Sequence, residues 1–168
     1  MKFAATLTVL ASAALSVASA QGGTYTALSS CNSTSSVHFD ASNYSISPSP
    51  MCIGKPFCMT ASGTISTPIT QGAEYIIRGR YIGHSVINES YDLCALLAAN
   101  GTPCPIAAGA FNLNICVNAM PNLPYNMPLD YQFYATNGDS ELIFCQITPD
   151  FPSRAPHPAS GIVATTCA

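Results

Sequence analysis

Acidic residues, serines and histidines are the side chains of this sequence that could carry out catalysis, but they form no catalytic motif. The sequence contains no G-x-S-x-G nucleophile motif and no glycine-rich phosphate-binding loop. Two carboxylates could in principle flank a glycosidic bond. The candidates are better interpreted as solvated charges, in turns, on polar strand faces or in a glycosylation motif: Glu89, Asp92, Asp130, Asp139 and Glu141. We therefore expect no catalytic residue, no cofactor and no enzymatic activity.

Cysteine is the reactive residue type that occurs in an informative number. The eight cysteines all follow residue 20, and an even count in an exported chain indicates four disulfides, although spacing alone does not choose the pairs. A metal site is the competing interpretation, but there is no C-x-x-C motif, and His38, His84 and His157 are spread without ligand spacing. The sequence thus predicts a disulfide framework and no metal. The cysteines are Cys31, Cys52, Cys58, Cys94, Cys104, Cys116, Cys145 and Cys167.

Four asparagines stand in N-x-[ST] motifs that could accept a glycan. They are Asn32, Asn43, Asn88 and Asn100, and none of the motifs has proline in its middle position. Each motif alone is a weak signal in a chain rich in serine and threonine. In an exported chain, however, we expect at least two of the four to be glycosylated.

The first twenty residues predict export. Lys2 provides a positive start, residues 3–17 are mostly apolar, and Ala18-Ser19-Ala20 is typical of a signal-peptide cleavage site. The apolar run is shorter than the roughly 20 residues that span a bilayer, which argues against a membrane anchor. We expect residues 1–20 to be a signal peptide and the mature protein to be extracellular or in a vacuolar or lysosomal lumen.

Charge and composition limit the partners of the mature chain. Only 8% of residues are charged, 48% are hydrophobic, and tryptophan is absent. Loss of Lys2 with the signal peptide changes the formal net charge from −3 to −4 and leaves four basic residues: Lys55, Arg78, Arg80 and Arg154. Because so few cations cannot neutralise a row of phosphates, we expect no nucleic-acid partner.

The elements that must position these residues are predicted to be strands. Apolar Phe111, Leu113, Ile115 and Val117 alternate with polar neighbours, and the Asn137-Gly138-Asp139 turn separates two further alternating runs. A helix is expected only at residues 93–99, and residues 149–168 are expected to be an irregular, proline-rich tail. The pattern predicts an all-β domain over residues 21–148, a seven-stranded antiparallel immunoglobulin-like β-sandwich. Its strands lie near residues 37–46, 59–65, 75–82, 85–93, 111–117, 129–136 and 142–147.

The order of cysteines and short motifs resembles the ML lipid-recognition family. The resemblance rests on Cys31-Asn32, on Pro50-Met51-Cys52 with Cys58, on Tyr91-Asp92-Leu93-Cys94 with Cys104-Pro105-Ile106, and on Leu142-Ile143-Phe144-Cys145. It covers about residues 31–148. Within the family, the chain looks most like the fungal phosphatidylglycerol/phosphatidylinositol transfer proteins, and less like the Niemann-Pick type C sterol carrier.

This resemblance implies a disulfide pattern. Cys52 would pair with Cys58, Cys94 with Cys104, and Cys31 with Cys145. Cys116 and Cys167 match no cysteine of the family, so they are left to pair with each other. The position of Cys116 supports this pair, because it lies on the face of its strand opposite the apolar one, where the tail could reach it.

The resemblance also implies an apolar cavity between the two sheets that holds one lipid. The inward side chains of the predicted strands would line it, although ordinary sandwich core is the alternative interpretation of each. The candidates are Met59, Ile65, Ile77, Phe111, Leu113, Ile115, Val117, Tyr131, Phe133 and Phe144.

The mouth of the cavity is expected between residues 83–87 and residues 120–127. The second segment places apolar side chains among prolines, which indicates either a rim that enters a membrane or a loop folded back on the core. The mouth candidates are Val86, Ile87, Met120, Leu123, Tyr125 and Met127.

The function that the resemblance implies is lipid transfer without chemistry. The partner would be a phospholipid (phosphatidylinositol or phosphatidylglycerol) or a sterol, with transient membrane contact by a monomer. We expect phospholipid to be preferred, because Tyr91-Asp92-Leu93-Cys94-Ala95-Leu96-Leu97 resembles the phospholipid-transfer branch more than the sterol-carrier branch. The preceding segment Val86-Ile87-Asn88-Glu89-Ser90 also lacks the prolines found before the matching cysteine in the sterol carrier. One alternative is a secreted interaction module without transfer activity. The other is an extracellular carbohydrate-active domain, but such a domain should present aromatic platforms, and the absence of tryptophan argues against it.

Overall fold

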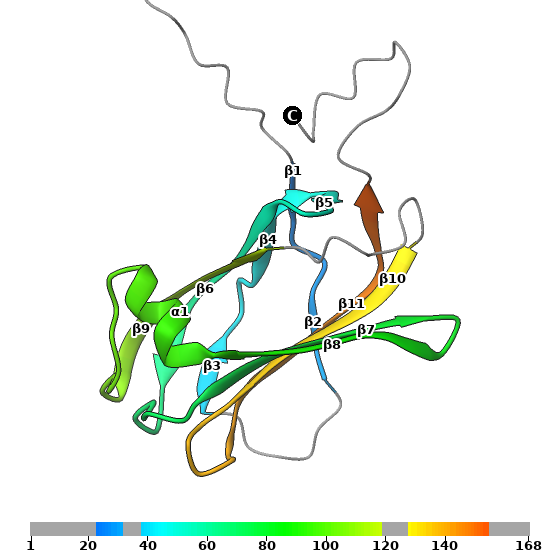
Figure 1. Ribbon diagram of the computed structural model, residues 1–168. Helices are drawn as coiled ribbons and strands as arrows, with labels where there is room; N and C mark the ends of the chain where they lie inside the picture. Colours follow the sequence, from blue (N-terminus) through cyan, green and yellow to red (C-terminus); the bar gives the residue numbers. More distant parts are fainter. Residues whose placement is uncertain (1–22, 32–37, 119–127, 155–168) are drawn as a thin grey trace, which may run out of the picture.

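The protein is a β-sandwich of two sheets. The computed structural model describes residues 23–31, 38–118 and 128–154, and within them it contains eleven strands and one short helix. The two sheets lie face to face, with the helix at one end of the sandwich (Figure 1). This arrangement confirms the predicted all-β sandwich. Within the described residues, no helix is both long enough and apolar enough to cross a membrane.

The first sheet is built around β6 (Pro56–Ile65). Along one side of β6 runs β9 (Gly109–Asn118), paired over ten positions from Pro56↔Asn118 to Ile65↔Gly109. The other side is shared by β4 (Ser45–Ser49) and β3 (Phe39–Ala41), which pair with successive parts of β6. A short strand, β1 (Gly23–Tyr25), extends the sheet beyond β4.

The second sheet has the order β2-β11-β10-β7-β8. Its long strands are antiparallel: β7 (Glu74–Tyr81), β8 (His84–Asp92), β10 (Pro128–Thr136) and β11 (Leu142–Arg154). The short β2 (Ser29–Ser30) and β5 (Met51–Cys52) also pair with β11, and the β5 pair is parallel. Because β8 has a strand neighbour on one side only among the described residues, it forms an edge of this sheet.

Alternation along the strands produces the core, as the sequence predicts. On β9, Phe111, Leu113, Ile115 and Val117 are buried, whereas the intervening asparagines are exposed. Successive side chains of a strand point to opposite faces, so one face of each strand contributes to the space between the sheets. Aromatic pairs connect the layers there, such as Phe57 of the first sheet with Phe133 of the second, whose ring centroids lie 6.3 Å apart.

The strand boundaries differ from the prediction at both ends of the domain. The strand expected at residues 37–46 is divided into β3 and β4 around Ser42 and Asn43. The structure also adds three strands of two or three residues, β1, β2 and β5. Residues 149–154, predicted to begin an irregular tail, instead continue β11, where Pro152 lies opposite Pro128. Proline has no backbone N–H group, so this pairing leaves no N–H without a hydrogen-bond acceptor.

Two of the predicted disulfides are confirmed. Cys31–Cys145 connects residues 114 positions apart in the chain, and Cys94–Cys104 closes a local loop. The predicted pairs Cys52–Cys58 and Cys116–Cys167 are wrong, because Cys58 bonds to Cys116. The β6–β9 register puts these two residues directly opposite each other, with Cα atoms 4.0 Å apart on the outer face of the first sheet. The prediction that Cys116 faces away from the core is therefore right, but its partner is Cys58 on the neighbouring strand.

Cys52 is also disulfide-bonded, and its partner lies outside the described residues. Cys167 is the one cysteine of the sequence not otherwise accounted for. We predict that non-reducing peptide mapping will find Cys58 linked to Cys116 and Cys52 linked to Cys167. Recovery of a peptide that links Cys52 to Cys58 would contradict the β6–β9 register.

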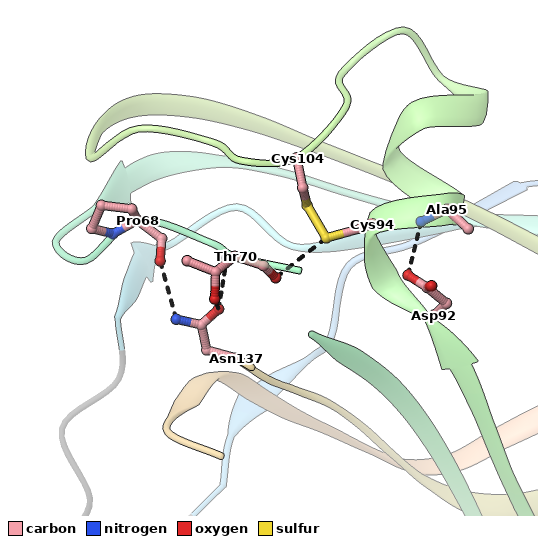
Figure 2. Close-up of a disulfide and its surroundings, with 7 residues drawn as sticks. All are labelled: Pro68, Thr70, Asp92, Cys94, Ala95, Cys104 and Asn137. Atoms are coloured by element: carbon pink, nitrogen blue, oxygen red, sulfur yellow. Dashed lines mark hydrogen bonds between the residues drawn. A yellow bond between two sulfur atoms is a disulfide. The ribbon is translucent and has the colours of Figure 1, made fainter. Parts of the chain in front are cut away.

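The helix α1 (Leu93–Ala99) connects the edge strand β8 to the loop before β9. It begins at Asp92, whose carboxylate accepts a hydrogen bond from the Ala95 N–H at 3.0 Å, and Cys94 attaches it to Cys104 (Figure 2). Asp92, predicted to be a solvated charge, is thus exposed and also caps the helix. Buried Leu93 and Leu97 place the helix against the end of the sandwich.

The turn between β10 and β11 is held to the loop before β7 by the buried side chain of Asn137 (Figure 2). Its Oδ1 accepts from the Thr70 N–H at 2.8 Å and from the Thr70 hydroxyl at 3.2 Å, and its Nδ2 donates to the Pro68 carbonyl at 3.0 Å. These three hydrogen bonds satisfy the buried amide and connect the two loops at the end of the sandwich nearest α1.

Candidate functional site

The inner face of the second sheet is organised in rows that run across four strands. The registers of β11, β10, β7 and β8 align the residues of each row, and residues directly opposite in an antiparallel pair share a face. The row nearest α1 is mainly aromatic, and the row farthest from it is partly polar. From that far end, the rows are Thr148, Tyr131, Gly79 and Ile87, then Gln146, Phe133, Ile77 and Glu89, and finally Phe144, Ala135, Tyr75 and Tyr91.

The facing surface comes from β6 and β9 of the first sheet. Met59 lies opposite Ile115 and Ala61 opposite Leu113, so the buried side chains of the two strands form one continuous apolar layer. The Tyr75 hydroxyl of the second sheet reaches to 4.0 Å from the Met59 sulfur of the first. All ten residues predicted to line a cavity are buried between the sheets, with Phe111 the most exposed at 8%. Their contact with a lipid remains a prediction.

No described residue between the sheets carries a buried charge. The buried polar side chains of the described residues are those of Asn137, Gln146 and Thr148. Burial raises the pKa values of Tyr44, Tyr75 and Tyr131 above the ordinary tyrosine value, so these phenols stay neutral at physiological pH. The layer between the sheets is therefore apolar among the described residues, and these phenols do not ionise near neutral pH.

The edge strand β8 turns two polar side chains toward this space. Glu89 lies opposite buried Ile77, and Tyr91 lies opposite buried Tyr75, so both share the inner face. Both are half-buried. Partial burial, and to a smaller extent the neighbouring Glu89 carboxylate, raises the pKa of Tyr91. Glu89, predicted to be a solvated charge, is half-buried because strand register places it on the inner side of a sheet edge, where a charge also discourages pairing with another strand.

The predicted mouth is described on one of its two sides. Ile87 is buried under the sheet edge, whereas Val86 is 45% exposed. The turn between β7 and β8 adds Ile82, a residue that the sequence prediction missed, which is 77% exposed with a φ of 48°. The sequence signal that could have identified Ile82 was an apolar, β-branched residue directly before a glycine in a predicted turn. Met120, Leu123, Tyr125 and Met127 lie outside the described residues.

Gly79 provides the space that Ile87 occupies. A Cβ at position 79 would lie 2.5 Å from Ile87 Cδ1 and 3.0 Å from its Cβ and Cγ1. We predict that Gly79→Ala lowers the free energy of unfolding by about 1–3 kcal/mol through overpacking, measured by urea denaturation. Shortening the neighbour in the double variant Gly79→Ala/Ile87→Val should restore part of the loss. A single variant as stable as the wild type would contradict the described contact.

The outer face of the second sheet carries the two arginines Arg78 and Arg80. Arg78 donates from Nε to Asn88 Oδ1 at 3.3 Å and lies over the ring of Tyr134, 5.0 Å from its centroid. With Arg80 it borders a shallow cavity of about 390 Å³. These cations are separated by the sheet from the inner rows and are not available to them.

Three of the four potential glycosylation sites are exposed, and Asn32 lies outside the described residues. Asn43 and Asn88 use only their Oδ1 atoms in described hydrogen bonds, which leaves Nδ2 for a glycan. Asn100, by contrast, donates from Nδ2 to the Leu96 carbonyl at 3.0 Å at the end of α1. Glycosylation remains a prediction at each of them. No group of three or more potential metal ligands occurs among the described residues.

Comparison with known proteins identifies relatives for this arrangement. The sequence model of the ML domain matches residues 25–149. Two phosphatidylglycerol/phosphatidylinositol transfer proteins are similar in sequence. That of Aspergillus oryzae is 31% identical over 117 residues, 68% of this chain and 65% of the relative. That of Kluyveromyces lactis is 32% identical over 120 residues, 68% of each. The chain thus spans about two thirds of the length of these relatives.

Two solved structures share the fold at low sequence identity. A Niemann-Pick type C2 protein from the Japanese carpenter ant superposes with a TM-score of 0.57 and 16% identity, over 76% of this chain and 98% of that protein. Chicken MD-1, crystallised with lipid IVa, superposes with a TM-score of 0.50 and 17% identity, over 71% and 83%. Both likenesses concern the arrangement of the two sheets.

Proposed function

Because this chain belongs to the ML domain family, we propose that it binds one phospholipid between its two sheets and transfers it between membranes. The phospholipid class is phosphatidylglycerol or phosphatidylinositol, after which the two relatives similar in sequence are named. The observation that carries the proposal is the pair of facing apolar layers, which bury no charge among the described residues. An acyl chain is more stable in contact with such apolar side chains than in water.

Binding energy is available from burial alone. Each methylene group removed from water contributes about 0.8 kcal/mol, so one long acyl chain contributes on the order of 10 kcal/mol before ordering costs. No catalytic group is needed for this process. The absence of a catalytic motif from the sequence is consistent with a carrier, and we propose that the protein has no enzymatic activity.

The exposed end of the β7–β8 hairpin supports a membrane contact at the mouth. Ile82 and Val86 project apolar surface into water at the tip of this hairpin, which extends away from α1 (Figure 1). Isolated exposed apolar residues are ordinary, but Ile82 in the turn and Val86 near the start of β8, next to buried Ile87, are suited to shallow insertion between lipid head groups. We propose that this turn and the segment 120–127 form the rim through which lipid passes.

We propose that the protein acts after passage through the secretory pathway. The three described disulfides require an oxidising compartment, which agrees with the predicted signal peptide. A monomer is sufficient for the proposed function, because both layers around the lipid come from one chain.

Extraction of bound lipid from protein made through a eukaryotic secretory route tests the proposal. Native mass spectrometry is expected to find one phospholipid per chain, and chloroform extraction should identify it as phosphatidylglycerol or phosphatidylinositol. Protein with both glycans and disulfides intact but without lipid, even after incubation with phospholipid vesicles, would instead support a secreted interaction module. Sterol as the sole bound lipid would overturn the phospholipid assignment.

A further inference from the structure

Two buried hydroxyl groups in the partly polar row of the second sheet have no hydrogen-bond partner. They belong to Tyr131 of β10, whose side chain is buried, and to Thr148 of β11, which has no exposed surface. These residues are directly opposite each other in the β10–β11 register, and thus share the inner face. Tyr44 has a third unpartnered hydroxyl, but it lies apart from this row, beside Phe39 and Phe144.

The surroundings of the pair are apolar. The Tyr131 ring stacks on Phe133, with centroids 5.5 Å apart, and meets the edge of Phe151 at 5.8 Å. A hydroxyl buried without a partner costs about 1–3 kcal/mol, and the great majority of buried polar groups in proteins are hydrogen-bonded. Two such groups on directly opposite residues of one face therefore indicate a partner that is not part of the chain.

The row leads from the hydroxyl pair to the proposed mouth. From Tyr131 it continues through Gly79 of β7 to Ile87 of β8, at the edge of the sheet. Adjacent strands are about 4.8 Å apart, so the backbone of Tyr131 lies roughly 10 Å inside this edge and that of Thr148 roughly 14 Å inside it. Gly79 has no side chain, which leaves Ile87 as the bulky group of the row between the hydroxyls and the edge. A phospholipid that enters at this edge carries ester carbonyls between its phosphate and its acyl chains, and these are its polar groups nearest to an apolar interior.

We infer that the hydroxyls of Tyr131 and Thr148 donate hydrogen bonds to the ester carbonyl oxygen of the bound phospholipid. The inference rests on the proposed function and adds a specificity: the site selects acyl esters over lipids that lack a carbonyl. Both hydroxyls are neutral donors, since burial raises the pKa of Tyr131. A carbonyl oxygen has two lone pairs and accepts both bonds, whereas the ether oxygen of an alkyl lipid is a much weaker acceptor.

The test compares two probes that differ only in the linkage: diester phosphatidylglycerol and its diether analogue, each with the same chain length and head group. Binding to the full-length glycosylated protein is measured by competition with a fluorescent phospholipid. The wild type should bind the diester about tenfold more tightly, as expected for two net hydrogen bonds. The double variant Tyr131→Phe/Thr148→Val should bind both probes within about twofold of each other.

Two controls separate this role from a purely structural one. The substitutions are nearly isosteric and remove unpartnered hydroxyls, so the lipid-free double variant should melt at or above the wild-type temperature. Tyr134→Phe, on the outer face of the same strand, should keep the preference for the diester. Equal affinity of the wild type for diester and diether would overturn the inference. The inference would also be overturned if the double variant lost affinity for both probes by the same factor. If neither probe binds to the wild type, the proposed function fails as well.

Discussion

Replacing Ile115 with aspartate is expected to abolish folding, and with it lipid binding. Ile115 is 1% exposed and lies opposite fully buried Met59 in the middle of the first sheet. A carboxylate there has no partner, and burial of an unpaired charge costs several kcal/mol or more. Since domains of this size are stable by about 5–15 kcal/mol, most or all of the stability should be lost. Circular dichroism of the secreted protein should show no cooperative thermal transition.

Asn114→Asp is the matched control for this experiment. Asn114 precedes Ile115 on the same strand, but its side chain is exposed on the outer face. The same carboxylate should change the melting temperature little and leave lipid binding intact. Equal tolerance of both substitutions would show that the described face of β9 is wrong.

Removing the disulfide Cys31–Cys145 is expected to have the second-largest effect. The bridge closes a loop of 114 residues, whereas Cys94–Cys104 closes one of 10. In the loop-entropy account, the double alanine variant of the first should lose about 5 kcal/mol of stability and that of the second about 3 kcal/mol. The Gln132 Nε2 group also donates toward both sulfurs of the first bridge, at 3.5 and 3.3 Å, and would lose these contacts.

Urea denaturation of the two alanine pairs provides the measurement. The difference between them is more informative than either value, because both variants remove the same chemical group. A smaller loss for Cys31–Cys145 than for Cys94–Cys104 would contradict the view that the first bridge mainly constrains the unfolded chain. It would instead indicate that the local bridge holds α1 and the adjacent end of the sandwich.

The long strands could be predicted because each has one buried face. In β9, four large apolar residues alternate with three asparagines and a cysteine, and only a strand gives both groups a suitable environment. The same reasoning failed for β1, β2 and β5, since two or three residues contain no period. It also failed for the end of β11, where Pro149 and Pro152 resemble an irregular segment although the backbone continues to pair.

The wrong disulfides have a different cause. The resemblance to the ML family implied a local bridge between Cys52 and Cys58, and it left Cys116 to Cys167. The partner of Cys58 depends instead on the register between β6 and β9, which are separated by more than forty residues. The register between distant strands depends on the packing of all buried side chains together, so neither strand's sequence determines it alone.

The candidate site shows the same division between local pattern and long-range register. All ten predicted cavity residues are buried, because alternation was sufficient to identify the inner faces. The polar members of those faces were missed. Glu89 and Thr148 are inward only because of the registers of β7 with β8 and of β10 with β11, which include a shift between Leu129 and Tyr131. Exposure of Ile82 likewise depends on the turn geometry.

Competitive transfer between vesicles tests the central claim most directly. Donor vesicles would contain fluorescent phosphatidylinositol and a spectrally distinct fluorescent sterol in equal amounts, and unlabelled acceptor vesicles would receive them. The wild type is expected to accelerate phosphatidylinositol transfer in proportion to protein concentration, with little sterol movement, and heat-denatured protein should transfer neither. Preferential sterol transfer would overturn the phospholipid assignment, and transfer of neither lipid by folded protein would contradict the account of this domain as a lipid carrier.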